Sequence, residues 1–175
     1  MYDLIKSGKI AGSRVLTIIM KNLEQETAVD VLEDTLRFVV PAILGKFLQS
    51  EFYETKNTEM FDLMLKIMQS GTFNQYAFAM ETLLTSAIGF AESENSAKLV
   101  YKWFVMGKVV DAAGNTIVGT NINVKIRHTL VRKIFSTSAI SKESKKQCFK
   151  SLAKLDQSDM LGRTEKYCEA ANPTM

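Results

Sequence analysis

Few residues in this sequence are of the types that carry out acid–base or nucleophilic chemistry. The 175-residue chain has one histidine, His128, and two cysteines, Cys148 and Cys168. A zinc hydrolase site of the His-Glu-x-x-His kind needs two histidines on one helical face, so this chain cannot form one. It also has no Gly-x-Ser-x-Gly nucleophile elbow, no phosphate-binding loop and no Gly-x-Gly-x-x-Gly turn. The sequence therefore predicts a chain with no catalytic residue, metal or cofactor of its own.

The remaining candidates for chemistry have simpler interpretations. His128 is predicted to be a partly buried or surface histidine. The two cysteines lie on apolar stripes of neighbouring helices, which favours packed free thiols over a disulfide or a redox pair. Arg127 and Arg132 are the better candidates for binding, because a planar guanidinium holds a carboxylate through two hydrogen bonds.

Charge is unevenly distributed along the chain, although the net charge is only +3. Glu24 to Asp62 contains nine acidic and three basic residues, a balance of −6, whereas Lys125 to Lys154 contains nine basic residues and one acidic, a balance of +8. The basic block is either an anion-binding face or a solvated surface. The second interpretation is favoured for five lysines whose spacing predicts exposure, namely Lys142, Lys145, Lys146, Lys150 and Lys154.

Two classes of partner are not expected. No aromatic-interleaved basic motif or helix-turn-helix signature accompanies the positive charge, so the sequence does not predict binding to nucleic acid. No apolar run approaches the roughly 20 residues of a membrane span, so no membrane partner is expected either.

Helical periodicity extends over nearly the whole chain. The apolar spacing predicts about eight helices, over residues 13–23, 27–48, 57–70, 73–90, 93–106, 124–135, 141–155 and 157–171. Ser13, Thr27, Asn57 or Thr58, and Ser93 or Asn95 are candidate N-caps, and Gly71 follows a predicted helix end. Pro41 should kink or divide the second helix. Residues 109–123 contain two short β-prone runs around a Gly-Asn turn and predict a loop or small hairpin.

This pattern predicts one all-α domain over residues 1–175. Consecutive amphipathic helices with short connections are typical of antiparallel helical hairpins, which we expect to form a short superhelix of the HEAT or armadillo type. A compact irregular bundle is the alternative, since no rigid repeat period is visible. The predicted core includes Ile18, Leu36, Phe61, Leu65, Leu83, Trp103, Leu130 and Phe149.

Several segments resemble a known family. Residues 126–131 (Ile-Arg-His-Thr-Leu-Val), 155–163 (Leu-Asp-Gln-Ser-Asp-Met-Leu-Gly-Arg) and 170–173 (Ala-Ala-Asn-Pro) are similar to the C-terminal helical domain of M1-family zinc aminopeptidases. Residues 2–10 resemble the helix that opens that domain, and 103–107 resemble one of its helix ends. The sequence departs from the bacterial-type pattern at His128, where that pattern usually has Trp, and in the polar insertion at 110–120.

The resemblance implies a non-catalytic C-terminal fragment of an aminopeptidase. The family's zinc-binding and substrate-binding motifs lie in a preceding catalytic domain, so zinc would be bound there and not by this chain. The implied fold is a HEAT-like superhelix that covers the active site and controls peptide access. The implied partners are the catalytic domain of the same polypeptide and peptide substrates, with Arg127 and Arg132 binding a peptide carboxylate or lining the domain seam.

Two other functions stay open on the sequence alone. One is a stand-alone helical-repeat adaptor that binds another protein. The other is an unrelated small helical bundle with a ligand pocket. The two unpaired cysteines favour a cytoplasmic location.

Overall fold

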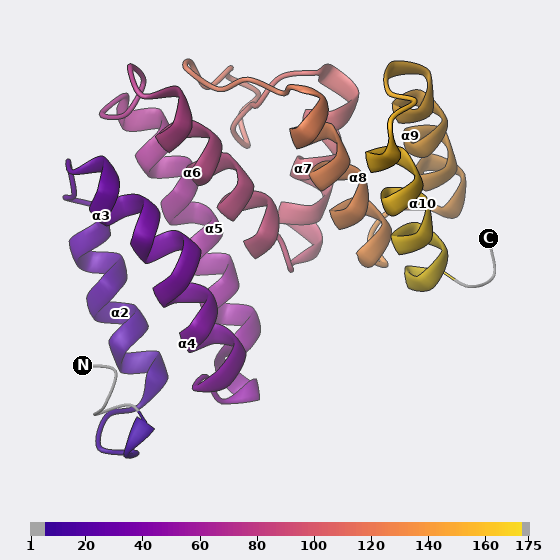
Figure 1. Ribbon diagram of the computed structural model, residues 1–175. Helices are drawn as coiled ribbons and strands as arrows, with labels where there is room; N and C mark the ends of the chain where they lie inside the picture. Colours follow the sequence, from indigo (N-terminus) through magenta and orange to yellow (C-terminus); the bar gives the residue numbers. More distant parts are fainter. Residues whose placement is uncertain (1–5, 173–175) are drawn as a thin grey trace.

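The computed structural model describes residues 6–172, which are helical nearly throughout (Figure 1). The only extended pairing in this part of the chain is one antiparallel bridge between Val110 and Thr116. The all-α prediction is therefore confirmed. The elements are α2 (Gly12–Leu23), α3 (Val29–Asp34), the π-helical turn η1 (Thr35–Val39), α4 (Val40–Lys46), the 3-10 turn η2 (Ser50–Phe52), α5 (Tyr53–Ser70), α6 (Ala77–Phe90), α7 (Glu94–Met106), α8 (Val124–Ser136), α9 (Lys142–Leu155) and α10 (Asp159–Ala171).

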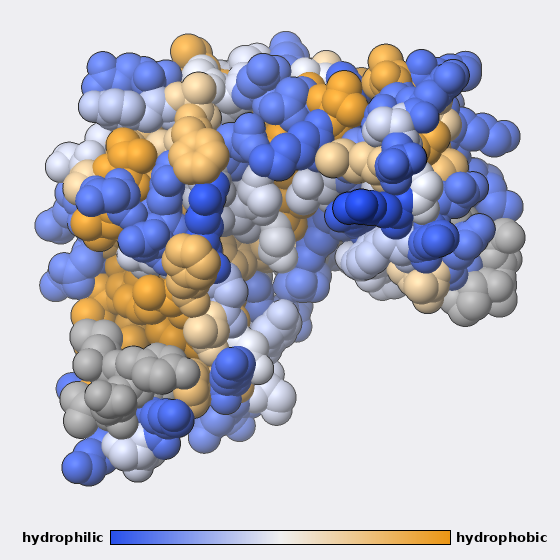
Figure 2. Space-filling model, in the orientation of Figure 1, coloured by the Kyte–Doolittle hydropathy of each residue, from blue (hydrophilic) through white to orange (hydrophobic). Residues whose placement is uncertain are grey.

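The helices form a two-layered array. One layer contains η1 with α4, then α6, α8 and α10, and each of these packs directly against the next. Helices α2, α5, α7 and α9 form the other layer, in which α5, α7 and α9 make few contacts with one another. The first layer is therefore a continuous helical surface. Figures 1 and 2 show that α2–α6 form one arm and α8–α10 the other, with a hollow between them.

The helix ends follow local chemistry where a cap is present. Ser93, Asn123, Ser141 and Ser158 each accept a hydrogen bond from a backbone N–H in the first turn of the helix that follows. The α5 and α7 helices end at Gly71 and Gly107, which adopt left-handed conformations with φ of 77° and 66°. Of the two caps that the sequence offers for α7, Ser93 and Asn95, the structure shows Ser93, and the predicted helix end at Gly71 is confirmed.

The predicted starts of the first three long helices are wrong. Helices α2, α3 and α5 begin after Ala11, Ala28 and Phe52, which make no side-chain capping bond. Asn57 instead lies inside α5, where its Nδ2 donates to the carbonyl of Tyr53 at 2.8 Å. Because packing fixes these starts, a search for capping residues could not locate them.

Pro41 modifies its helix without dividing it. The chain stays helical from Val29 to Lys46, and the π-helical turn η1 lies immediately before the proline. The N–H of Val40 reaches back to the carbonyl of Thr35, five residues away. Proline has no N–H, so the regular α-helical ladder cannot continue at this point. The wider π turn keeps both halves of the helix on one continuous path.

The core prediction is confirmed for most of its members. Leu36, Phe61, Leu83, Trp103 and Leu130 are buried, and Leu65 and Phe149 are half-buried against the core. Ile18 is the exception, since it is 40% exposed. On α2 the core side is taken by Val15, Leu16 and Leu23. Apolar residues surround much of this helix, so periodicity alone does not show which side is buried.

The segment between α7 and α8 is an ordered loop. The indole Nε1 of Trp103 donates to the carbonyl of Val110 at 2.7 Å, deep in the core. A carboxylate oxygen of Asp111 accepts the N–H of Asn115 at 2.8 Å and closes the turn. The single Val110–Thr116 bridge gives the segment the small hairpin character that the sequence predicts.

Candidate functional site

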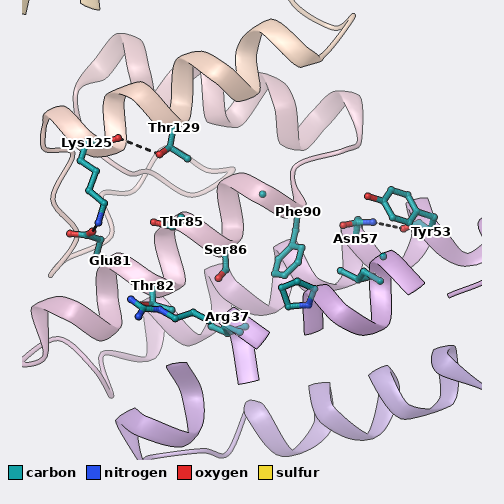
Figure 3. A pocket seen from close by; sticks show the side chains of 15 residues that line it. Arg37, Tyr53, Asn57, Glu81, Thr82, Thr85, Ser86, Phe90, Lys125 and Thr129 are labelled. Atoms are coloured by element: carbon teal, nitrogen blue, oxygen red, sulfur yellow. Dashed lines mark hydrogen bonds and ion pairs between the residues drawn. The ribbon is translucent and has the colours of Figure 1, made fainter. Parts of the chain in front are cut away.

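A polar groove lies on the first layer, mostly on the arm formed by α2–α6, and it reaches α8 at one end (Figure 3). Its volume is about 490 Å³, and its walls come from η1, α4, the start of α5, α6 and α8. Apolar side chains such as Leu36, Leu44 and Phe90 contribute to the lining. Hydroxyl and amide groups share it, namely Tyr53, Asn57, Thr82, Thr85, Ser86 and Thr129.

The charged residues of the groove lie together at one end, while Tyr53 and Asn57 lie at the other (Figure 3). Glu81 on α6 and Lys125 on α8 form an ion pair with an O–N distance of 2.5 Å. The guanidinium of Arg37 lies 4.4 Å from the ring centroid of Phe78 and donates to Thr82 Oγ1 at 3.3 Å. Arg37 is thus held in place while its side chain remains exposed.

The middle of the groove offers free hydroxyls. Thr85 and Ser86 have no side-chain hydrogen bond within the described residues, and Thr129 Oγ1 donates to the carbonyl of Lys125 at 3.3 Å. A groove with unpaired hydroxyls beside apolar side chains can hydrogen-bond an extended peptide backbone and contact its side chains. The charged end can then bind a terminal carboxylate.

Arg127 and Arg132 lie outside the lining of this groove and do not share a face. The Arg127 guanidinium lies 5.7 Å from the ring centroid of Phe104 on α7. The Nε of Arg132 donates to Thr164 Oγ1 on α10 at 3.2 Å. Both side chains are half-buried between helices. The two candidate arginines therefore lie at different helix contacts, Arg127 against α7 and Arg132 against α10.

The basic block does not form a single anion-binding face. Lys125 is paired with Glu81, and Lys133 pairs with Glu92 at 2.8 Å. The prediction that Lys145 is exposed is wrong, because only 4% of it is accessible. Its Nζ donates to the carbonyl of Phe135 at 3.2 Å and to Asn172 Oδ1 at 3.3 Å. Burial lowers the pKa of Lys145, with a further contribution from the charge of Lys142.

A buried polar network surrounds the only histidine. His128 is 2% exposed, and its Nε2 lies 2.6 Å from Asp156 Oδ2. Its Nδ1 lies 2.9 Å from Thr164 Oγ1, which also accepts the hydrogen bond from Arg132. With the Nε2–H tautomer of His128, every hydrogen bond in this series has one donor and one acceptor. Arg132 donates to Thr164, Thr164 donates to His128, and His128 donates to Asp156.

Asp156 completes the network at the start of α10. It accepts hydrogen bonds from the backbone N–H and the hydroxyl of Ser158, both at 2.9 Å. These bonds, the backbone one first, together with the one from His128, lower the pKa of the Asp156 carboxyl. A hydroxyl–imidazole–carboxylate series is also the arrangement of a catalytic triad. Here Thr164 is 0% exposed, so no substrate reaches it, and the network serves to fasten α10 to α8.

Sequence reasoning missed this network, although its parts were visible. The segments 126–131 and 155–163 contain two of its members, and Asp156 and Ser158 have the spacing of a local capping turn. That His128 lies against both could not be read from the sequence, because 28 residues separate it from Asp156. The two segments that carry the family resemblance therefore meet in one cluster.

The cysteines behave as the sequence predicts. Cys148 and Cys168 are buried free thiols. Burial raises the pKa of Cys148 to about 11 and that of Cys168 to about 12. Both thiols are therefore protonated and unreactive at neutral pH.

The described residues contain no group of three or more His, Cys, Asp or Glu side chains able to hold a metal ion. None of the helices in this part of the chain has the length and apolar content to span a bilayer. Comparison with known protein families, with curated proteins and with solved structures found no match to this chain. Of the segments that carry the family resemblance, residues 2–5 and Pro173 lie outside the described residues.

Proposed function

We propose that this chain is a non-catalytic domain of an M1-family zinc aminopeptidase, in which it covers the active site and limits access to peptides. The observation that carries the proposal is the groove across η1, α6 and α8. Its free hydroxyls and its charged end suit an extended peptide with a terminal carboxylate. Catalysis, and the zinc that performs it, belong in this proposal to a preceding domain of the same polypeptide, in the cytoplasm.

Two features of the chain support this assignment. The segments that resemble the family, residues 126–131 and 155–163, are joined by the His128–Asp156 contact and so act as one structural unit. The one hydroxyl–imidazole–carboxylate series is inaccessible, which suits a binding domain better than a hydrolase.

The groove changes which residues we propose for peptide binding. Arg37 is exposed beside the groove and is held by Phe78 and Thr82, so it is the better candidate for binding a peptide carboxylate. Arg127 lies between α8 and α7, and Arg132 lies between α8 and α10. They remain candidates for positions near the seam with the catalytic domain.

The second candidate function is a stand-alone adaptor that binds another protein. It is favoured by exposed apolar side chains on α3 and η1, where Val31, Phe38 and Val39 are 46%, 67% and 43% exposed. Apolar surface is concentrated over this arm in Figure 2. Exposed patches of this kind often mark protein-binding surfaces.

The reading frame upstream of Met1 in the native transcript distinguishes the two functions. The aminopeptidase proposal expects that frame to continue into a domain that contains a His-Glu-x-x-His sequence. A transcript in which translation starts at Met1 would rule out the catalytic-domain partner and leave the adaptor function.

A further inference from the structure

A second groove lies between α9 and α10, away from the polar groove of the first layer. Both helices pack against α8, and they lie next to each other on the same side of it with few contacts between them (Figure 1). Phe135 of α8, Phe149 of α9 and Cys168 of α10 contribute its apolar lining. The rings of Phe135 and Phe149 meet edge to face, with centroids 6.5 Å apart. The groove is therefore a hydrophobic slot between two helices.

The two banks of this slot carry opposite charges. Lys146 and Lys150 line it on α9, and Glu165 and Glu169 line it on α10. No salt bridge joins these four side chains to each other or to any other described residue. The lysines are four residues apart and so are the glutamates, so each bank presents two like charges one helical turn apart.

The size of the slot indicates what it can hold. Its volume is about 220 Å³, below the roughly 300–1,000 Å³ of typical small-molecule pockets. A slot of that size accepts one or two large apolar side chains that project from a helix. Ordinary ridge-into-groove packing of helices would fill it in this way.

We propose that the α9–α10 slot is the docking site for a single amphipathic helix of a partner protein. The partner helix inserts an apolar stripe between Phe149 and Cys168. One edge of that helix carries two acidic residues four apart, which meet Lys146 and Lys150. The other edge carries two basic residues four apart, which meet Glu165 and Glu169. This inference does not depend on the proposed function, because none of these residues lines the polar groove.

Three synthetic helical peptides test the proposal by fluorescence anisotropy with the full chain. All carry the same leucine stripe, and their edges are Glu and Lys, Lys and Lys, or Glu and Glu. The chain should bind the Glu/Lys peptide at least tenfold more tightly than the other two, with the preference weakening as salt is added. Equal binding of all three peptides, or no binding of any, overturns the proposal.

Charge reversal on one bank sharpens the test. In the Lys146→Glu/Lys150→Glu variant both banks are acidic, so the preference should switch to the Lys/Lys peptide. The matched control is Lys154→Glu/Lys166→Glu, which changes charge equally at two exposed lysines outside the slot and should keep the original preference. Circular dichroism checks that both variants fold. A preference that stays unchanged in the first variant contradicts the proposal.

Sedimentation of the chain without peptide tests for a different occupant. The account expects a monomer across the concentrations used for binding. A dimer that dissociates in the Lys146→Glu/Lys150→Glu variant would show that a second copy of this chain occupies the slot, and would overturn the proposal of a partner helix.

Discussion

His128 determines how the terminal helices are held. It is 2% exposed and joins Asp156 and Thr164, which lie in the α9–α10 connection and in α10. A buried network of this kind stabilises only when all its members are satisfied, and loss of one member leaves the others unpaired.

His128→Ala should therefore destabilise the chain by roughly 1–3 kcal/mol, the usual cost of leaving a buried polar partner unsatisfied. Chemical denaturation monitored by circular dichroism measures this change in the free energy of unfolding. The exposed Lys166→Ala on α10 is the control and should shift stability by less than about 0.5 kcal/mol. A His128→Ala variant as stable as the control would mean that the network contributes nothing.

Asp156 gives the same network a pH dependence. Its pKa is lowered in the folded chain, so the carboxylate contributes stability that is fully present above the ordinary aspartate pKa of about 4. That contribution is lost as the pH falls through the lowered folded-state value. The stability advantage of the wild type over Asp156→Asn should therefore shrink from pH 6 to pH 3, as measured by unfolding at each pH. A constant difference across that range would be inconsistent with the lowered pKa.

The helical hairpin that contains α2 and α4 depends on a close approach between two backbone segments. A Cβ added at Gly12, at the start of α2, would lie 2.2 Å from the carbonyl oxygen of Phe47, just beyond the end of α4. The nearest atom is a backbone oxygen, so no flexible side chain can move aside to make room. The hairpin therefore requires glycine at this position.

Gly12→Ala should destabilise the chain by about 1–3 kcal/mol, in the range of overpacked sites. Gly162→Ala is the matched control, because no atom lies within 4 Å of a Cβ built there, inside α10. It should be neutral or stabilising by up to about 1 kcal/mol. Thermal unfolding of the two variants compares them directly, and equal melting temperatures would show that α2 and α4 separate at no cost.

A buried side-chain hydrogen bond from Trp103 ties the α7–α8 loop to the core. Trp103→Phe removes the donor to the carbonyl of Val110 and leaves that carbonyl buried without its partner. Amide hydrogen exchange should accelerate in residues 109–117 and change little in α9 and α10. Tyr101→Phe is the control, since the Tyr101 hydroxyl has no hydrogen bond within the described residues. Uniform acceleration across the chain would show that the indole supports the whole core and not this loop.

How much the sequence reveals also differs between elements. The starts of the helices that follow Ser93, Ser141 and Ser158 can be located from the sequence, because the side chain of each serine caps its helix. Those that begin after Ala11, Ala28 and Phe52 could not, because tertiary packing sets their ends. Periodicity likewise identified an apolar side on α2 but placed Ile18 on the wrong face.

The candidate site was less accessible to sequence reasoning than the fold. The groove joins Arg37, Thr82 and Lys125, which come from three helices far apart in the chain. No short motif contains them, and only the packing of η1, α6 and α8 brings them together. Lys145 shows the same limit, because it has the spacing of an exposed lysine yet caps the end of α8 from the interior.

For the whole molecule, we propose that the continuous surface of η1, α4, α6 and α8 binds extended peptides. In this proposal, exposed Arg37 distinguishes a free terminal carboxylate from a neutral end, through a charge-assisted hydrogen bond.

Titration of the isotopically labelled chain with a nonapeptide, followed by NMR chemical shifts, tests this claim most directly. We expect shifts in Arg37, Thr82, Thr85 and Ser86. We also expect the C-terminally amidated peptide to bind more weakly, and the Arg37→Ala variant to bind the free-acid peptide more weakly. Absence of shifts, or shifts confined to residues outside the groove, would contradict it.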